Sequence, residues 1–345
     1  MTTPWYLPKQ YPSDWFFDGR KQPDADTIIR ENDWTPYNDI QCQMIEMAYV
    51  NKQSEAKLDG YTIDLKNMIQ YNNTDHQKQR RVCRHERIEV TSRIRNYSDS
   101  GSINSGRFNV PPILVSLGEW RISQFPLVEE WTKRNPHYRY KSQDTVEQIA
   151  SGIAKEGSEL NPPKTLEAQY VSNQLLKFKD KPLHEIMIYC VVLYTYQSFI
   201  YTLINSVLWK EDMTKVDTLG PYCCMLRNFL HEDQEAVHET VYRATDLTVE
   251  QFKEYVNSKG QIKTWPAFSS TSKSRDAVKQ FGNTLFVIEF NNDAAPCYPG
   301  RAIASYSMYE KEQEILLYPG VDFRVDSVEE SREKPFKYII HLSLM

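Results

Sequence analysis

Glycine is scarce in this chain, proline is not enriched and cysteine is infrequent, and each of these observations excludes a class of protein. With only 12 glycines and 18 prolines in 345 residues, a largely disordered chain is excluded. The 6 cysteines form no Cys-x-x-Cys pair and no His/Cys spacing typical of zinc, so we expect no metal site. The N-terminus lacks a charged segment followed by an apolar core. We therefore expect no signal peptide and an intracellular location, cytoplasmic or nuclear.

An excess of positive charge is also missing. The net charge is -5, which gives no reason to expect nucleic-acid binding, sequence-specific or general. Basic residues are concentrated between Lys78 and Arg95, with seven basic residues against two acidic ones. The hydrophobic fraction of 40% and charged fraction of 25% are those of a soluble globular protein, and the length allows two or three domains.

One apolar run is long enough to raise the question of a membrane span. It extends from Ile186 to Trp209 without a formal charge. Polar side chains such as Gln197 and Asn205 are spread through the run rather than gathered at its ends, and each would need a partner in lipid. We expect a buried helix, or two joined helices, and no association with a membrane.

Composition divides the chain into four parts. Residues 1–95 are rich in aromatic side chains, and residues 96–109 are rich in Ser, Gly and Asn, which favours a flexible linker. Residues 110–164 are too apolar for a linker and are interpreted as an N-terminal extension of the last part, residues 165–345.

The last part changes from helical to β patterns. Residues 165–232 are expected to be mostly helical, and residues 240–345 mostly β. The expected strands are Thr240–Arg243, Leu285–Phe290, Glu314–Tyr318, Phe323–Val328 and Tyr338–Leu344. Segregated helices and strands predict an α+β fold.

Near the N-terminus, Trp15, Trp34 and Glu46 occur in the order that gives the WWE domain its name. The resemblance covers roughly residues 10–90. It implies a small half-barrel sheet with one helix. Many members of this family bind poly(ADP-ribose) through the iso-ADP-ribose unit, while others are protein-interaction modules.

Four side chains in this region suit an adenine between two phosphates. Tyr37 and Tyr61 offer aromatic faces and hydroxyls. Gln70 can donate to and accept from an adenine edge, and Arg80, with Arg81 or Arg84, can form paired hydrogen bonds with a phosphate. We therefore expect poly(ADP-ribose), or proteins that carry it, as partners of this domain.

Near the other end, Glu312-Gln313-Glu314 opens an apolar strand-like segment, and two carboxylates at this spacing are expected to project to the same side of a strand. Upstream, Arg243 lies in a short β-like segment. Ser270 lies in a cluster of hydroxyl side chains that follows a second β-like segment. This ordered set resembles the R-S-E triad of arginine-type ADP-ribosyltransferases. The resemblance covers roughly residues 165–345 and implies a helical lobe, a split β-sandwich core and NAD as substrate.

The resemblance also implies roles. Glu314 would stabilise the positive charge that develops on the ribose as nicotinamide leaves, and Glu312 would hold the acceptor guanidinium and take its proton. Arg243 would pair with the NAD phosphates or adjacent ribose, and Ser270 would hold the nicotinamide-ribose region. Phe281 is a further candidate for binding NAD, by stacking on nicotinamide.

Several of these assignments have alternatives. Arg243 could form a structural ion pair, and Ser269 or Ser272 could be the relevant hydroxyl. Trp265 could replace Phe281, and a core role is open for both. In the loop before the carboxylates, Tyr306 and Tyr309 are suggested as acceptor contacts, with ordinary loop packing as the alternative.

The sequence thus predicts an NAD-dependent mono-ADP-ribosyltransferase that modifies arginine in a protein acceptor. Two alternatives are an NAD glycohydrolase, in which water is the acceptor, and a non-enzymatic reader of poly(ADP-ribose). Glu312 argues against the first and the full triad against the second. A poly(ADP-ribose) polymerase would carry an H-Y-E pattern, and Arg243 and Ser270 stand in its first two places.

Overall fold

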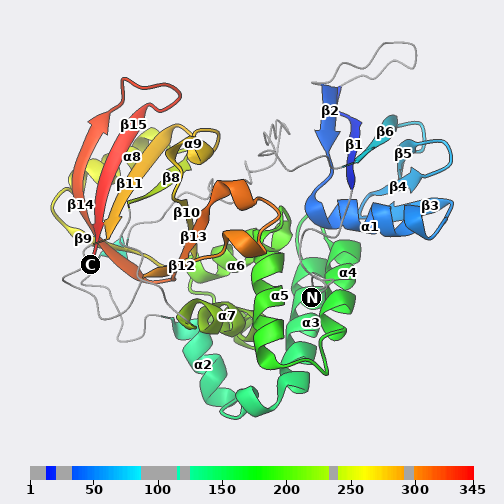
Figure 1. Cartoon of the computed structure of the whole chain (residues 1–345), viewed down its shortest axis with the longest axis horizontal. Helices are drawn as coiled ribbons and strands as arrows, with labels where there is room; N and C mark the ends of the chain where they lie inside the picture. Colours follow the sequence, from blue (N-terminus) through cyan, green and yellow to red (C-terminus); the bar gives the residue numbers. More distant parts are fainter. Residues whose placement is uncertain (1–12, 21–32, 87–114, 117–124, 233–239, 291–298) are drawn as a thin grey trace.

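The structure is a computed structural model with a small sheet, a cluster of helices and a larger sheet (Figure 1). It describes residues 13–20, 33–86, 115–116, 125–232, 240–290 and 299–345. The expected linker, residues 96–109, lies outside these ranges. So do parts of the 110–164 segment.

The N-terminal sheet is antiparallel throughout its six strands, in the order β2-β1-β6-β5-β4-β3. The strands are β1 (Ser13–Asp18), β2 (Trp34–Pro36), β3 (Glu55–Leu58), β4 (Tyr61–Asp64), β5 (Ile69–Asn72) and β6 (Gln79–Glu86). A single helix, α1 (Asp39–Val50), lies along one end of the sheet (Figure 1). The small sheet with one helix that the motif implied is confirmed.

A buried polar contact joins the helix of this domain to its sheet. Trp15 Nε1 donates to Glu46 Oε2 at 2.8 Å, and Arg84 donates to both oxygens of Glu46 at 2.8 and 3.0 Å. Burial opposes ionisation of Glu46, but the hydrogen bonds from Arg84 and Trp15 outweigh it and hold the pKa of the carboxyl below its ordinary value. The second and third residues of the motif thus have different structural roles: Trp34 opens β2, whereas Glu46 links α1 to β1 and β6.

In the described ranges, six helices lie between the two sheets in the order of the chain. They are α2 (Pro126–Arg134), α3 (Ser142–Ser158), α4 (Thr165–Leu176), α5 (Leu183–Thr195), α6 (Phe199–Trp209) and α7 (Val216–His231), with short 3₁₀ turns at Tyr138–Tyr140 and Met213–Lys215. Helices α2 and α3 come from the segment for which the sequence suggested no elements. They share one hydrophobic core with α4, α5 and α7, through residues such as Trp131, Ile149 and Leu226.

The apolar run from Ile186 to Trp209 forms the two joined helices that were one of the two expectations. Helices α5 and α6 meet at 96°, and Ile186, Tyr194 and Ile204 are all buried in the helical core. Within the described ranges, no single helix is both long and apolar enough to cross a membrane, and only this bent pair passes the test of length and composition.

The larger sheet has nine strands in the order β12-β13-β10-β8-β11-β15-β14-β9-β7. Its strands are β7 (Val115–Ser116), β8 (Val241–Thr245), β9 (Ile262–Trp265), β10 (Ser269–Ser272), β11 (Thr284–Phe290), β12 (Gly300–Ala302), β13 (Glu314–Leu317), β14 (Val321–Glu330) and β15 (Tyr338–Leu344). Helices α8 (Val249–Asn257) and α9 (Arg275–Val278) accompany it. Adjacent strands are antiparallel except β11 and β15.

This sheet is divided in the middle. Strands β10 and β8 share a single register pair, Ser272 opposite Tyr242, so the three strands on one side are joined to the remaining six at one point. Side chains of β13 pack in two cores: Leu316 belongs to the helical core, and Ile315 and Leu317 to a core formed within the sheet. The expected α+β class, with a helical lobe and a split β core, is confirmed.

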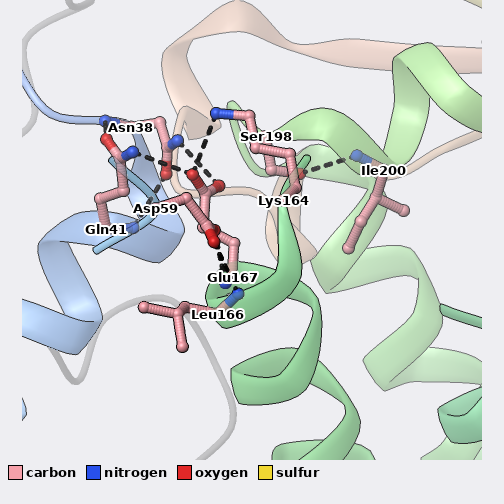
Figure 2. A network of polar contacts seen from close by, with 8 residues as sticks. All are labelled: Asn38, Gln41, Asp59, Lys164, Leu166, Glu167, Ser198 and Ile200. Carbon is pink, nitrogen blue, oxygen red and sulfur yellow. Dashed lines mark hydrogen bonds and ion pairs between the residues drawn. The ribbon is translucent and has the colours of Figure 1, made fainter. Parts of the chain in front are cut away.

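The two domains meet at a polar contact around α4 (Figure 2). Glu167 is buried and accepts from Asn38 Nδ2 at 3.0 Å, Gln41 Nε2 at 2.9 Å and Lys164 Nζ at 3.2 Å. In the other direction, the carboxylate of Asp59 accepts from the backbone N–H groups of Leu166 and Glu167 at 2.9 and 3.0 Å. Each domain thus satisfies donors of the other, including free N–H groups in the first turn of a helix.

Candidate active site and ligand site

Three neighbouring strands carry the predicted triad. Arg243 lies in β8, Ser270 in β10 and Glu314 at the start of β13. These strands are consecutive in the sheet, and all three side chains are buried. Residues that are far apart in sequence thus lie side by side at the place where the sheet divides.

Arg243 is held inside the protein as a cation. Its Nη1 donates to the carbonyl oxygen of Ser270 at 2.9 Å, and its guanidinium lies 5.9 Å from the ring centre of Trp265. Burial lowers the pKa of Arg243 to about 10, against the opposing influence of Tyr194, Tyr255 and Glu314. The guanidinium therefore remains charged near neutral pH and lies within the electrostatic reach of Glu314.

Hydrogen bonds distinguish the four hydroxyl groups of the cluster Ser269–Ser272. Three of the four hydroxyls have partners: Ser269 Oγ donates to Ala267 O at 3.4 Å, Thr271 Oγ1 to Ile315 O at 2.8 Å and Ser272 Oγ to Glu312 O at 2.5 Å. Ser270 Oγ is buried and has no hydrogen-bond partner within the described part of the chain. A buried hydroxyl in that state requires an explanation, and a ligand would supply one.

The strand argument for the two carboxylates was wrong. Glu312 closes a 3₁₀ turn, Glu310–Glu312, and Gln313 adopts a left-handed conformation with φ 47° before β13 begins at Glu314. The period-two alternation of a strand therefore does not relate the two side chains. Both are nonetheless buried, with exposures of 1% for Glu312 and 0% for Glu314, and both flank the turn that leads into β13.

The hydroxyl cluster follows strand β9, as expected, and itself forms strand β10. The pairing of β10 with β13 aligns Ser272 with Glu314 and Ser270 with Leu316. This pairing holds the serines and the carboxylates in a fixed register. The loop 304–312 is the remaining part of the site, with a 3₁₀ turn at each end, Ala304–Tyr306 and Glu310–Glu312.

Aromatic candidates near the site are in the core. Trp265 is buried and its Nε1 donates to Tyr255 Oη at 3.2 Å. Phe281 is buried in a small cluster with Val278, Leu285 and Phe336. These positions fit the core role that the sequence left open, and stacking of Phe281 on nicotinamide stays a prediction.

Tyr309 is buried and its hydroxyl donates to both oxygens of Asp39 at 2.9 Å, which fits the packing alternative, and its contact with the acceptor stays a prediction. Tyr306 is half-buried and packs edge-on against Phe229, with ring centres 5.1 Å apart. This contact is the ordinary loop packing that was the alternative for Tyr306.

In the N-terminal domain, three of the four predicted ligand residues form one unit. Tyr37 Oη donates to Gln70 Oε1 at 2.6 Å, and Gln70 in β5 lies directly opposite Arg80 in β6. Tyr61 lies on the same face of the sheet, because Ile63, two residues later, is paired with Gln70. Tyr61 is 40% exposed, whereas Tyr37 and Gln70 are buried.

Arg80 and its neighbours make the surroundings of this unit positive. Arg80 Nη1 donates to Asp18 O at 3.0 Å, and its guanidinium lies 5.5 Å from the ring centre of Phe17. Burial raises the pKa of the Tyr37 hydroxyl, so this group remains a donor.

Sequence reasoning missed the contact between Arg20 and Asp18 beside this unit. The hydrogen bonds from Arg20 lower the pKa of Asp18, with burial opposing and the charge of Arg80 adding to the effect. A basic residue two positions after an acidic one at the end of a strand was the available signal.

In the described ranges, no group of three or more His, Cys, Asp or Glu side chains could hold a metal ion. The groups gathered at the β10–β13 site are one guanidinium, hydroxyls and two carboxylates. Such a set suits a charged organic substrate with phosphates, hydroxyls and a developing positive charge.

Comparison with known protein families agrees with this chemistry. Residues 15–84 match the model of the WWE domain, and residues 191–345 match the model of ADP-ribosyltransferase exoenzymes. The chain therefore carries a WWE domain followed by an ADP-ribosyltransferase domain, which confirms the order that the motifs indicated. NAD is the substrate of ADP-ribosyltransferases. A search of curated proteins finds no match.

Solved structures show partial similarity. HopU1, an ADP-ribosyltransferase of Pseudomonas syringae pv. Tomato DC3000, is 18% identical with a TM-score of 0.42, over 60% of this chain and 96% of that one. The type III effector XopAI of Xanthomonas axonopodis pv. citri, with its N-terminus truncated, is 18% identical with a TM-score of 0.45, over 64% and 98%. Plx2a, an ADP-ribosyltransferase toxin of Paenibacillus larvae, is 16% identical with a TM-score of 0.40, over 47% and 86%.

Proposed function

We propose that this protein is an NAD-dependent mono-ADP-ribosyltransferase of protein arginine that is recruited to poly(ADP-ribose) by its WWE domain. The observation that carries the proposal is the arrangement of Arg243, Ser270 and Glu314 on consecutive strands. The buried Ser270 hydroxyl, which has no partner within the described residues, adds to it.

The chemistry begins with cleavage of the bond between nicotinamide and ribose. The electron pair of that bond leaves with nicotinamide, and positive charge develops on the anomeric carbon of the ribose. Glu314 stabilises this charge from a buried position, where the interaction is stronger than in water. Arg243 holds the phosphates or the adjacent ribose of NAD, and Ser270 holds the nicotinamide-ribose region.

The acceptor is then held by the second carboxylate. Arginine has a pKa above about 12, so its guanidinium is not a nucleophile until it loses a proton. Glu312 orients the guanidinium and takes that proton as the new carbon–nitrogen bond forms. A buried second carboxylate is of no evident use to an NAD glycohydrolase, because water needs no partner of opposite charge. We therefore favour transfer over hydrolysis.

Binding of poly(ADP-ribose) is supported by the unit of Tyr37, Gln70 and Arg80. Gln70 and the Tyr37 hydroxyl offer hydrogen bonds suited to an adenine edge, and Tyr61 adds an aromatic face at the rim. Arg80 carries the positive charge for a phosphate. Because poly(ADP-ribose) is an intracellular polymer, this proposal goes together with a cytoplasmic or nuclear location.

The test uses labelled NAD and the full chain, with agmatine as a small guanidino acceptor. We expect label on agmatine and release of nicotinamide, and loss of both in Glu314→Gln. Nicotinamide release without label on agmatine would favour the glycohydrolase. Neither product, together with binding of iso-ADP-ribose in calorimetry, would favour the non-enzymatic reader.

A further inference from the structure

The WWE domain touches the loop that precedes the two carboxylates. Asp39 is the first residue of α1 in the WWE domain, and its side chain is only 2% exposed. Tyr309 Oη, from loop 304–312, donates to both oxygens of Asp39 at 2.9 Å. The partners are 270 residues apart in sequence, so this contact bridges the two domains.

Tyr309 in turn is joined to the backbone of Glu312. The backbone N–H of Glu312 donates to Tyr309 O at 2.9 Å, and Tyr309 N donates to Ser307 Oγ at 3.0 Å. The 3₁₀ turn Glu310–Glu312 and the left-handed Gln313 separate the tyrosine from the strand that starts at Glu314. A shift of Tyr309 would therefore be passed to the backbone of Glu312, which Ser272 Oγ also holds through the Glu312 carbonyl.

Asp39 is itself fixed by both domains. Its Oδ2 accepts from the backbone N–H of Gln197 at 2.7 Å, and its own N–H donates to Gln197 O at 3.2 Å. Asn38 caps α1 through a capping box with Gln41, and the neighbouring Ile40 is buried in the helical core that also contains Tyr309. Asp39 is thus held by the start of α1 on one side and by the turn between α5 and α6 on the other.

The side chain of Asp39 is buried and accepts hydrogen bonds from both domains. A buried carboxylate must be stabilised by donors, and the donors here include the Tyr309 hydroxyl and a backbone N–H, close to the positive end of α1. A hydrogen bond to a charged group is stronger than one between neutral groups. Tyr309 is therefore restrained more firmly than packing alone would restrain it.

We propose that Asp39 of the WWE domain is a positioning residue for transfer to arginine, acting through Tyr309 on Glu312. This inference rests on the proposed function and deepens it, because it makes the WWE domain a part of the acceptor half of the active site. Arg243, Ser270 and Glu314, which serve NAD, are placed by strands β8, β10 and β13 instead. Loss of the Asp39 contact should thus impair transfer and spare NAD cleavage.

The experiment measures two rates in the full chain, transfer to agmatine and hydrolysis of NAD. Asp39→Asn and Tyr309→Phe should each lower the ratio of transfer to hydrolysis by about tenfold, the effect of losing one hydrogen bond to a charged group. Hydrolysis itself should stay within about twofold. The double variant should be no worse than either single variant, because both remove the same interaction.

The matched control is Asp59→Asn, which removes a carboxylate from the other contact of the WWE domain, at the start of α4. The ratio should be unchanged in this variant. An equal fall of the ratio in Asp39→Asn and Asp59→Asn would overturn the inference in favour of general docking of the domains. So would a parallel fall of both rates in Asp39→Asn, or unchanged rates.

If Asp39→Asn fails to fold, Tyr309→Phe alone still tests the inference, since it keeps the ring and removes only the hydroxyl that contacts Asp39. If the wild-type protein hydrolyses NAD and labels agmatine, and the variants keep its ratio of transfer to hydrolysis, only this inference is contradicted. A wild-type protein that never labels agmatine contradicts the proposed function and, with it, the inference.

Discussion

Ser272 and Glu312, which are 40 residues apart, are joined by a 2.5 Å hydrogen bond from the serine hydroxyl to the glutamate carbonyl. The same hydroxyl accepts from Ser274 N at 2.9 Å. Ser272 therefore links β10 to the backbone of the 3₁₀ turn that carries Glu312. Ser270, two residues earlier, keeps its buried hydroxyl without a partner in the described residues.

This difference predicts opposite effects for the two serines. Ser272→Ala should lower the free energy of unfolding by about 1–3 kcal/mol, because it leaves buried backbone groups without their partner. Ser270→Ala should leave the unfolding temperature nearly unchanged and slow nicotinamide release. Thermal unfolding and the rate of NAD cleavage are measured on both variants. A stable Ser272→Ala with slow cleavage, and an unstable Ser270→Ala with normal cleavage, would contradict the account.

The two carboxylates should be separable by their products. Glu312→Gln keeps the shape of the side chain but removes the base, so transfer to agmatine should fall by about 100-fold or more while NAD hydrolysis remains largely intact. Glu314→Gln should remove both activities. The measurement is the release of nicotinamide alongside labelling of agmatine. Loss of hydrolysis in Glu312→Gln would show that the separate acceptor role is wrong.

Binding of the polymer should depend on Arg80 and Gln70. Arg80→Ala and Gln70→Ala should each weaken binding of an iso-ADP-ribose fragment by about tenfold or more, the effect of one lost hydrogen bond to a charged group. Arg81→Ala is the matched control, because Arg81 carries the same charge and is exposed, but as the next residue of β6 it projects to the opposite face of the sheet. Binding is measured by calorimetry. An equal loss of affinity in all three variants would indicate general electrostatic attraction instead of a specific site.

The WWE domain should lose stability in acid through Glu46. The pKa of Glu46 is lower in the folded protein than its ordinary value of 4.5. Its contribution is therefore fully present above that value and is lost as pH falls through the lower, folded pKa. Arg84 stays charged throughout this range, so protonation of Glu46 alone weakens the contact.

Glu46→Gln is the control for this acid effect. At neutral pH it should lower the free energy of unfolding by about 1–3 kcal/mol, and the difference from the wild type should shrink below about pH 4.5. Thermal unfolding between neutral pH and about pH 3 measures it. A difference that stays constant over this range would rule out the assigned role of Glu46.

Much of the fold and several site residues could be predicted from local patterns. The alternation of strands and the apolar period of α1 are local, and so is the Trp15, Trp34 and Glu46 order that led to the WWE domain. Helices α2 and α3 were not predicted because their segment is interrupted by prolines and flanked by residues without a clear period. Their helical state depends on packing against α4 and α7.

Other features of the site could not be predicted from any single segment of the sequence. Glu312 and Glu314 resemble neighbours on a strand, but the left-handed Gln313 changes the chain direction between them. Tyr309 resembles an exposed loop tyrosine until Asp39, from another domain, is placed beside it. Both features come from contacts or conformations set by tertiary structure, which the local sequence does not encode.

The measurement that tests the central claim most directly is the mapping of the modified side chain by mass spectrometry. The full chain is incubated with labelled NAD and cell lysate, and modified peptides are compared with those from a Glu314→Gln control. The account predicts a single ADP-ribose unit attached to arginine, absent in the control. ADP-ribose attached to other residue types, or chains of several units, would contradict it.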